Sequence, residues 1–235
     1  MAMTTRLGII LALGGVVLLV AGPLGTRAGL WSFVVGFILM ALSLLFAVGA
    51  VVLSLVGAIR SGQWGLAAVA IVVALAIIAL PATVVVSARG APAIHEITTD
   101  VQEPPSFVAV LPLRANALNP PEYGGADVAA QQQRAYPDIQ PLVLRMDASQ
   151  AFQRALAAVR DLGWEEVGSD TMAGRIEAVD TTFWFGFKDD VVIRVREAAG
   201  GARVDVRSKS RVGRGDLGTN ARRVRRFLTA LREMN

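Results

Sequence analysis

Residues 188–211 read KDDVVIRVREAAGGARVDVRSKSR, and this stretch decides the fold of the second half of the chain. Apolar and polar side chains alternate with a period of two on both sides of Gly200-Gly201, as they do in strands that bury one face. The segment from Glu197 to Ala202 contains the two glycines and fits the turn between paired strands. The stretch therefore predicts a β-hairpin.

Three further strands are predicted upstream of this hairpin. Pro141 to Met146, Trp164 to Val167 and Gly174 to Thr181 are short runs with strand-like composition, bounded by turn residues. Together with the hairpin they form the strands of one antiparallel sheet.

Two helices are predicted beside these strands. Asp147 can cap the first helix, with Gln150 at its third position, and Gly163 ends it. The second helix begins after Asp216 and carries an apolar stripe at helical spacing. The stripe consists of Leu217, Ala221, Val224, Leu228 and Leu231. The order over residues 140–235 is β-α-β-β-β-β-α, which predicts a soluble α+β domain with an antiparallel sheet and two helices packed on one face.

Residues 1–90 have a different composition and predict a three-helix transmembrane region. They contain no acidic side chain, and before residue 89 the only charged side chains are three arginines. Apolar runs cover about 7–24, 30–59 and 66–88, each near or above the ~18 to 20 residues that cross a bilayer. The runs contain no ionisable side chain, which argues against a transporter.

Small residues recur along the second apolar run at spacings of three and four. They are Ser43, Ala47, Ala50, Ser54 and Gly57. Such a stripe lets another helix approach closely, although a high overall content of small residues explains the pattern equally well.

Residues 91–139 predict a proline-rich extended arm. Eight of the ten prolines lie between Pro92 and Pro141, and proline lacks the N–H that a central strand needs. A short helix is expected from Ala126 to Arg134. Spaced apolar side chains, among them Ile97 and Phe107, indicate that the arm packs against the folded domain.

The charge distribution is the strongest hint of function. Residues 203–235 carry ten basic and three acidic side chains, a net charge of +7. We expect a ligand-binding surface for an anionic group that includes Arg203, Arg207, Lys209, Arg211, Arg222 and Asp180. The alternative is a solvated face whose arginines pair with nearby carboxylates such as Asp205 and Glu177.

Three other motifs carry less weight. Gly213, Gly215 and Gly218 spell G-x-G-x-x-G, but a dinucleotide site needs a following parallel strand, and Asp216 is better placed as a helix cap. Asp180 precedes residues 183–187, FWFGF, for which we expect a core aromatic cluster with a polar turn, the alternative being a binding cleft. With no cysteine and a single histidine, we expect no metal site, no cofactor and no catalytic triad.

The segments 175–196, 204–213 and 216–222, read with the upstream segments 94–100 and 104–107, resemble the bacterial and plastid family DUF1499, a domain of unknown function. The resemblance covers about residues 92–231. Family members that look secreted, lipid-anchored or membrane-attached imply a cell-envelope protein. The family offers no catalytic residues to carry over.

Two functional hypotheses follow. The first is a membrane-anchored, non-enzymatic envelope module that binds an anionic amphiphile, a membrane surface or an envelope protein. The second is an envelope hydrolase that uses Asp180, Asp216 or Ser208, which the lack of a nucleophile-elbow motif weakens. Nucleic-acid binding is not expected, because the arginines lack interleaved aromatic residues. We expect a bacterial inner-membrane protein with an extracytoplasmic, periplasmic soluble domain; oligomeric state is not predicted.

Overall fold

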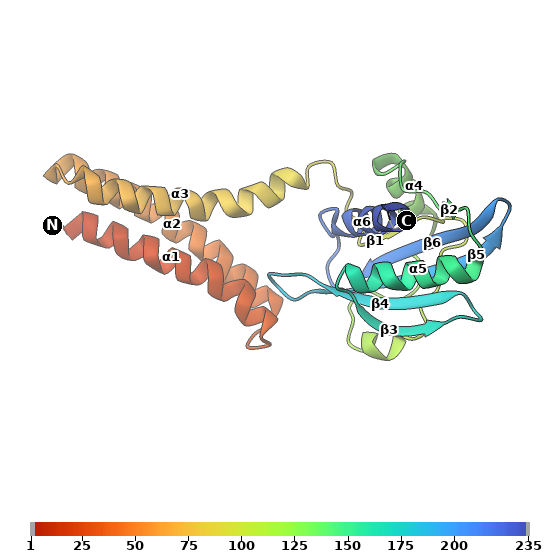
Figure 1. Cartoon of the computed structure of the whole chain (residues 1–235). Helices are drawn as coiled ribbons and strands as arrows, with labels where there is room; N and C mark the ends of the chain where they lie inside the picture. The colour runs from red at the N-terminus through yellow and green to blue at the C-terminus, as the bar shows by residue number, and fades with distance from the viewer. Residues whose placement is uncertain (1–2, 234–235) are drawn as a thin grey trace. The chain divides into compact units, whose positions relative to one another are not determined.

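The computed structural model describes residues 3–233, which divide into two compact units (Figure 1). The helical unit comprises the chain up to Arg89 together with Phe183–Gly186, and the α+β unit comprises Gly90–Thr182 and Phe187–Asn235. The helical unit contains α1 (Met3–Arg27), α2 (Phe33–Ser61) and α3 (Trp64–Ser87).

Each helix of the helical unit is long and apolar enough to cross a membrane. Their apolar side chains outside the contacts between helices are largely exposed, as expected for helices that face lipid. Pro81 lies inside α3, as the sequence indicates. The three predicted N-terminal helices are confirmed as helices that could span a membrane.

Small residues form the contact between α1 and α2. The stripe predicted on α2 is buried from Ser43 to Gly57, and α1 presents glycines to it. A Cβ atom on Gly8 would lie 2.9 Å from the backbone nitrogen of Ser54, and one on Gly57 would lie 2.8 Å from that of Thr5. The backbones of α1 and α2 therefore approach so closely that only glycine fits at positions 8 and 57.

We predict that Gly8→Ala destabilises the helical unit by about 1–3 kcal/mol, because the added methyl group overpacks the α1–α2 contact. The measurement is the thermal unfolding midpoint of the full chain in mild detergent. Gly65→Ala is the matched control, since a Cβ atom there meets nothing within 4 Å. Equal midpoints for the two variants would contradict the prediction.

The α+β unit is built on one six-stranded antiparallel sheet. The strands run in the order β1-β6-β5-β4-β3, and β2 also pairs with β6. The bounds are β1 (Glu96–Thr98), β2 (Leu142–Leu144), β3 (Glu165–Asp170), β4 (Arg175–Thr181), β5 (Lys188–Ala198) and β6 (Gly201–Ser210). The predicted hairpin is the β5–β6 pair, in register with Ile193 opposite Val206. The α+β prediction is confirmed.

Helices α5 (Ala148–Asp161) and α6 (Thr219–Glu233) cover one face of this sheet, as predicted (Figure 1). The core beneath them contains alternate residues of β5 and β6 and the stacked rings of Trp164 and Phe227, 5.8 Å apart. Asp147 caps α5 by accepting a hydrogen bond from the backbone N–H of Gln150 at 2.8 Å.

Between α3 and β2, the arm contains β1, a 3-10 helix, η1 (Leu111–Arg114), and α4 (Gly125–Ala135). Part of the arm covers the opposite face of the sheet. Phe107 and Val110 pack there against Val179 and Val192 in a separate apolar cluster. The residues around Phe107 thus form a second layer on the sheet, whereas Ile97 of β1 belongs to the core beneath the helices.

Two local expectations are wrong. Leu217 does not belong to the apolar stripe of α6: it precedes the helix with φ 53° and is 51% exposed. The residues of the FWFGF segment do not form a core cluster, because they make the turn between β4 and β5, where Phe183 is 72% and Trp184 57% exposed. At Leu217 and in the β4–β5 turn, the local backbone conformation directs apolar side chains away from the core.

Candidate functional site

The sheet face beneath the arm carries the basic residues of β6. Glu96 of β1 lies at their centre, with Oε2 2.8 Å from Nη2 of Arg207 and Oε1 3.1 Å from Nζ of Lys209. We call these three residues the Glu96 cluster. All three are almost completely buried, with Lys209 only 1% exposed. Burial lowers the pKa of the Lys209 ammonium and of the Arg207 guanidinium, and the Glu96 carboxylate opposes both shifts.

Backbone groups of the arm complete the Glu96 cluster. Arg207 donates hydrogen bonds to the carbonyls of Pro105 and Pro121, and Lys209 donates to that of Glu122 at 2.6 Å. The N–H of Gly124 donates to Oε1 of Glu96 at 2.8 Å. The cluster therefore fastens the arm to the sheet with charge-assisted hydrogen bonds.

A groove of about 430 Å³ opens above Arg207, between aromatic and proline side chains of the arm. The guanidinium lies 4.8 Å from the centre of the Phe107 ring and 5.6 Å from that of Tyr123. Burial raises the pKa of Tyr123 to about 12. Arg207 is already hydrogen-bonded to Glu96 and to backbone carbonyls, so an anion in this groove would compete with the Glu96 carboxylate for the guanidinium.

The other two strand arginines predicted to bind an anion also have internal partners. Nη2 of Arg203 lies 2.7 Å from Oδ2 of Asp100 and 3.0 Å from Oδ1 of Asp205. Nη2 of Arg211 lies 2.6 Å from Oδ1 of Asp190, a carboxylate that Arg114 also contacts. Each of these cations is paired with an internal carboxylate. Their binding of an external anion stays a prediction.

Beneath the helices, Arg223 of α6 joins the strands through a second buried network. Its Nε lies 2.7 Å from Oδ2 of Asp180, and its Nη2 lies 2.6 Å from Oδ2 of Asp189. Burial raises the pKa of the Asp189 carboxyl, and Arg223 opposes that shift. Asp180 thus fastens α6 to β4, while its side chain keeps some exposure to solvent.

The residues of the hydrolase hypothesis do not assemble around a nucleophile. The Ser208 hydroxyl donates to the amide oxygen of Asn220 at 2.6 Å and accepts from Arg223, so no general base is hydrogen-bonded to it. Asp216 caps α6 by accepting from the N–H groups of Gly218 and Asn220 at 2.8 and 2.7 Å. Its carboxylate fills the position that an external anion would take at this helix N-terminus.

The imidazole of the single histidine, His95, lies near Glu96 and Lys209 and has a hydrogen bond with the backbone of Arg214. The backbone carbonyl of His95 accepts a hydrogen bond from the Asn220 side chain, and burial lowers the pKa of its imidazole. Over residues 3–233, the acidic and histidine side chains form no group of three that could hold a metal ion.

Exposed arginines lie along α6 and the turn before it. They are Arg214, Arg222, Arg226 and Arg232. The guanidinium of Arg222 donates to the Leu217 carbonyl at 3.0 Å and to the Thr219 hydroxyl at 2.9 Å. Within the part of the chain that the structure describes, Arg214, Arg222 and Arg226 form no salt bridge, whereas Arg225 pairs with Asp138. These are the cations of the +7 segment that remain available to an external anion.

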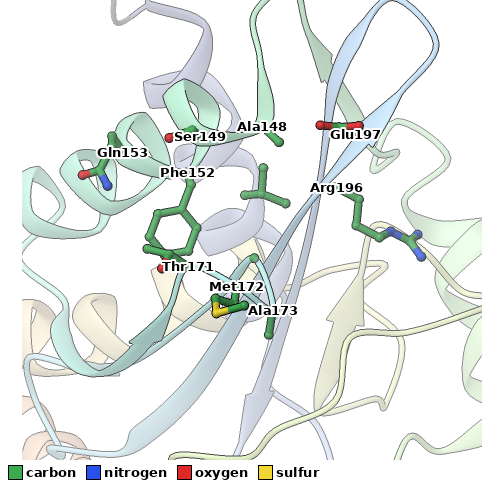
Figure 2. Close-up of a pocket in the computed structure, with 11 residues that line it drawn as sticks. Ala148, Ser149, Phe152, Gln153, Thr171, Met172, Ala173, Arg196 and Glu197 are labelled. Atoms are coloured by element: carbon green, nitrogen blue, oxygen red, sulfur yellow. The ribbon is translucent and has the colours of Figure 1, made fainter.

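A second groove, of about 400 Å³, lies at the start of α5 and was not anticipated from sequence. Figure 2 shows Phe152 pointing from α5 toward Thr171 and Met172 of the β3–β4 turn, while Arg196 points away from them. The Arg196 guanidinium donates instead to Glu103 at 2.8 Å. No chemical pattern in the sequence marks this groove, because its lining residues come from three separate segments, at 148–153, 171–174 and 195–197.

A family model described as a protein of unknown function, DUF1499, matches residues 96–231. The chain belongs to the DUF1499 family. The matched range begins in β1 and ends in α6, so the DUF1499 region contains the whole sheet, the Glu96 cluster and the Arg223 network. No curated protein and no solved structure matches the chain.

We predict that Glu96→Gln destabilises the DUF1499 region by about 3–5 kcal/mol, because it leaves two buried cations without a carboxylate. The measurement is the urea midpoint of the full chain in mild detergent, followed by pulse proteolysis. Glu166→Gln, which removes the partner of the exposed Arg160, should shift that midpoint by no more than ~1 kcal/mol. Equal shifts for the two variants would show that the buried Glu96 cluster contributes no more to the free energy of unfolding than an exposed salt bridge does.

Proposed function

We propose that the DUF1499 region is a membrane-anchored, non-enzymatic module that binds an anionic amphiphile or an anionic membrane surface through the exposed arginines of α6. The observation that carries the proposal is a contrast between two sets of cations. Arg203, Arg207, Lys209 and Arg211 are held by internal carboxylates, whereas Arg222 and Arg226 are exposed and form no salt bridge within residues 3–233.

The buried positions of α6 support this assignment. Val224, Phe227 and Leu228 face the core, which turns Arg222 and Arg226 toward solvent. Each basic residue near an anionic membrane contributes ~1 kcal/mol, so a few arginines give weak binding in solution. The three apolar helices would raise the effective affinity, because a tether keeps the module at high local concentration beside the membrane surface.

We propose further that the DUF1499 region lies outside the cytoplasm of a bacterial cell envelope. With three spans, the region is on the opposite side of the membrane from the N-terminus. Arg6 and Arg60 then lie on the cytoplasmic side, which the preference of cytoplasmic segments for positive charge favours slightly over the reverse.

To test binding, the full chain is placed in phosphatidylcholine nanodiscs and mixed with separate vesicles. One set of vesicles contains phosphatidylglycerol, and the other contains phosphatidylcholine alone. We expect co-flotation with the anionic vesicles that weakens as salt rises, since the Debye length is only ~8 Å at physiological ionic strength. Arg222→Ser with Arg226→Ser should weaken this binding by roughly 30-fold, from ~1 kcal/mol for each arginine.

The matched control removes the same charge elsewhere. Arg145 and Arg160 are exposed at the two ends of the α5 segment, and changing both to Ser should leave flotation nearly unchanged. If both double variants lose binding equally, only net charge matters and the α6 surface is not a site. Equal flotation of the original chain on both vesicle types would contradict the function itself.

The location is tested with a C-terminal alkaline phosphatase fusion, an enzyme that is active only outside the cytoplasm, and with a matching green fluorescent protein fusion. We expect phosphatase activity without fluorescence. The reverse result would place the DUF1499 region in the cytoplasm and would contradict the proposed location, although not the anion binding.

A further inference from the structure

The β4–β5 turn presents large aromatic side chains to the solvent. Phe183 is 72% exposed and Trp184 57% exposed, and their rings meet edge to face with centroids 5.2 Å apart. The turn has no charged side chain between Thr181 and Lys188, and Gly186 adopts φ 67°, which permits a tight reversal. We call Phe183–Gly186 the aromatic tip.

The aromatic tip groups with the helical unit, and its contacts there are with residues at one end of the apolar helices. Nη1 of Arg27 donates to the carbonyl of Phe183 at 2.6 Å, and the rings of Phe37 and Phe185 lie 4.8 Å apart. Arg27 is the last residue of α1, where the apolar span ends.

These neighbours have the composition of a membrane–water interface. Arg27 ends α1 and Trp31 lies in the connection between α1 and α2, and cationic and tryptophan side chains concentrate at the level of the lipid headgroups. An odd number of spans also puts this connection and the start of the DUF1499 region on the same side of the membrane. The aromatic tip therefore needs no further crossing to reach that interface.

We propose that the aromatic tip inserts Phe183 and Trp184 into the interfacial layer of the bilayer, as a lipid contact in addition to the three helices. Rings of this kind are favoured at the headgroup level because they combine an apolar body with a polar edge or a quadrupole. Insertion would remove the exposed apolar surface of Phe183 and Trp184 from water. The inference does not depend on anion binding by α6.

The chain has no cysteine, so a single introduced cysteine can carry a nitroxide spin label at a unique position. The full chain labelled at Phe183→Cys, and separately at Trp184→Cys, is reconstituted in phosphatidylcholine vesicles. Electron paramagnetic resonance then compares collisions with apolar oxygen and with a water-soluble nickel chelate. The control label is Met172→Cys, which lies in the β3–β4 turn at the other end of β4 and is 99% exposed.

We expect the tip labels to show several-fold lower accessibility to the nickel chelate than the Met172 label, with oxygen accessibility retained or raised. High accessibility to both reagents, as at Met172, would place the tip in water and overturn the proposal. Low accessibility to both would show that protein covers the tip, and would overturn it as well. The neutral lipid separates this test from that of the α6 arginines.

Discussion

A buried carboxylate shared by two buried cations is the interaction on which the α+β unit depends. Glu96 neutralises Arg207 and Lys209 and accepts the N–H of Gly124, while the same cations bind carbonyls of the arm. Desolvating these charges is costly, and the cost is offset only when every member is in place. The charged face of the sheet is thus stable only with the arm upon it, and the apolar cluster around Phe107 and Val192 closes with it.

Features governed by local periodicity could be predicted from the sequence. The β5–β6 hairpin, the Asp147 cap and the small-residue stripe of α2 each follow from a spacing of two, three or four residues. For the layer around Phe107, the sequence predicted only that the arm packs against the folded domain. Its partners could not be predicted, because pairing between Glu96 and Arg207 links residues 111 positions apart, and no local pattern specifies it. The exposed aromatic tip was missed because composition favours burial of aromatics, whereas a four-residue turn leaves them outside.

The candidate site shows why charge counted along a segment differs from charge available at a surface. Residues 203–235 carry a net +7, yet the strand cations within this segment are matched by carboxylates from the arm and from β5. Arg214, Arg222 and Arg226 of this segment are exposed and form no salt bridge within residues 3–233. Alternation correctly placed the strand cations on one face of β6, but it could not show that this face is covered.

The 111-residue separation within the Glu96 cluster also has a consequence for how the protein is made. During synthesis β1 leaves the ribosome long before β6, the strand with which it pairs. At elongation rates of about 5 to 20 residues per second, Glu96 and the apolar residues of the arm wait on the order of 5 to 20 s for their partners. The sheet closes only when β6, which pairs with β1, β2 and β5, has been made.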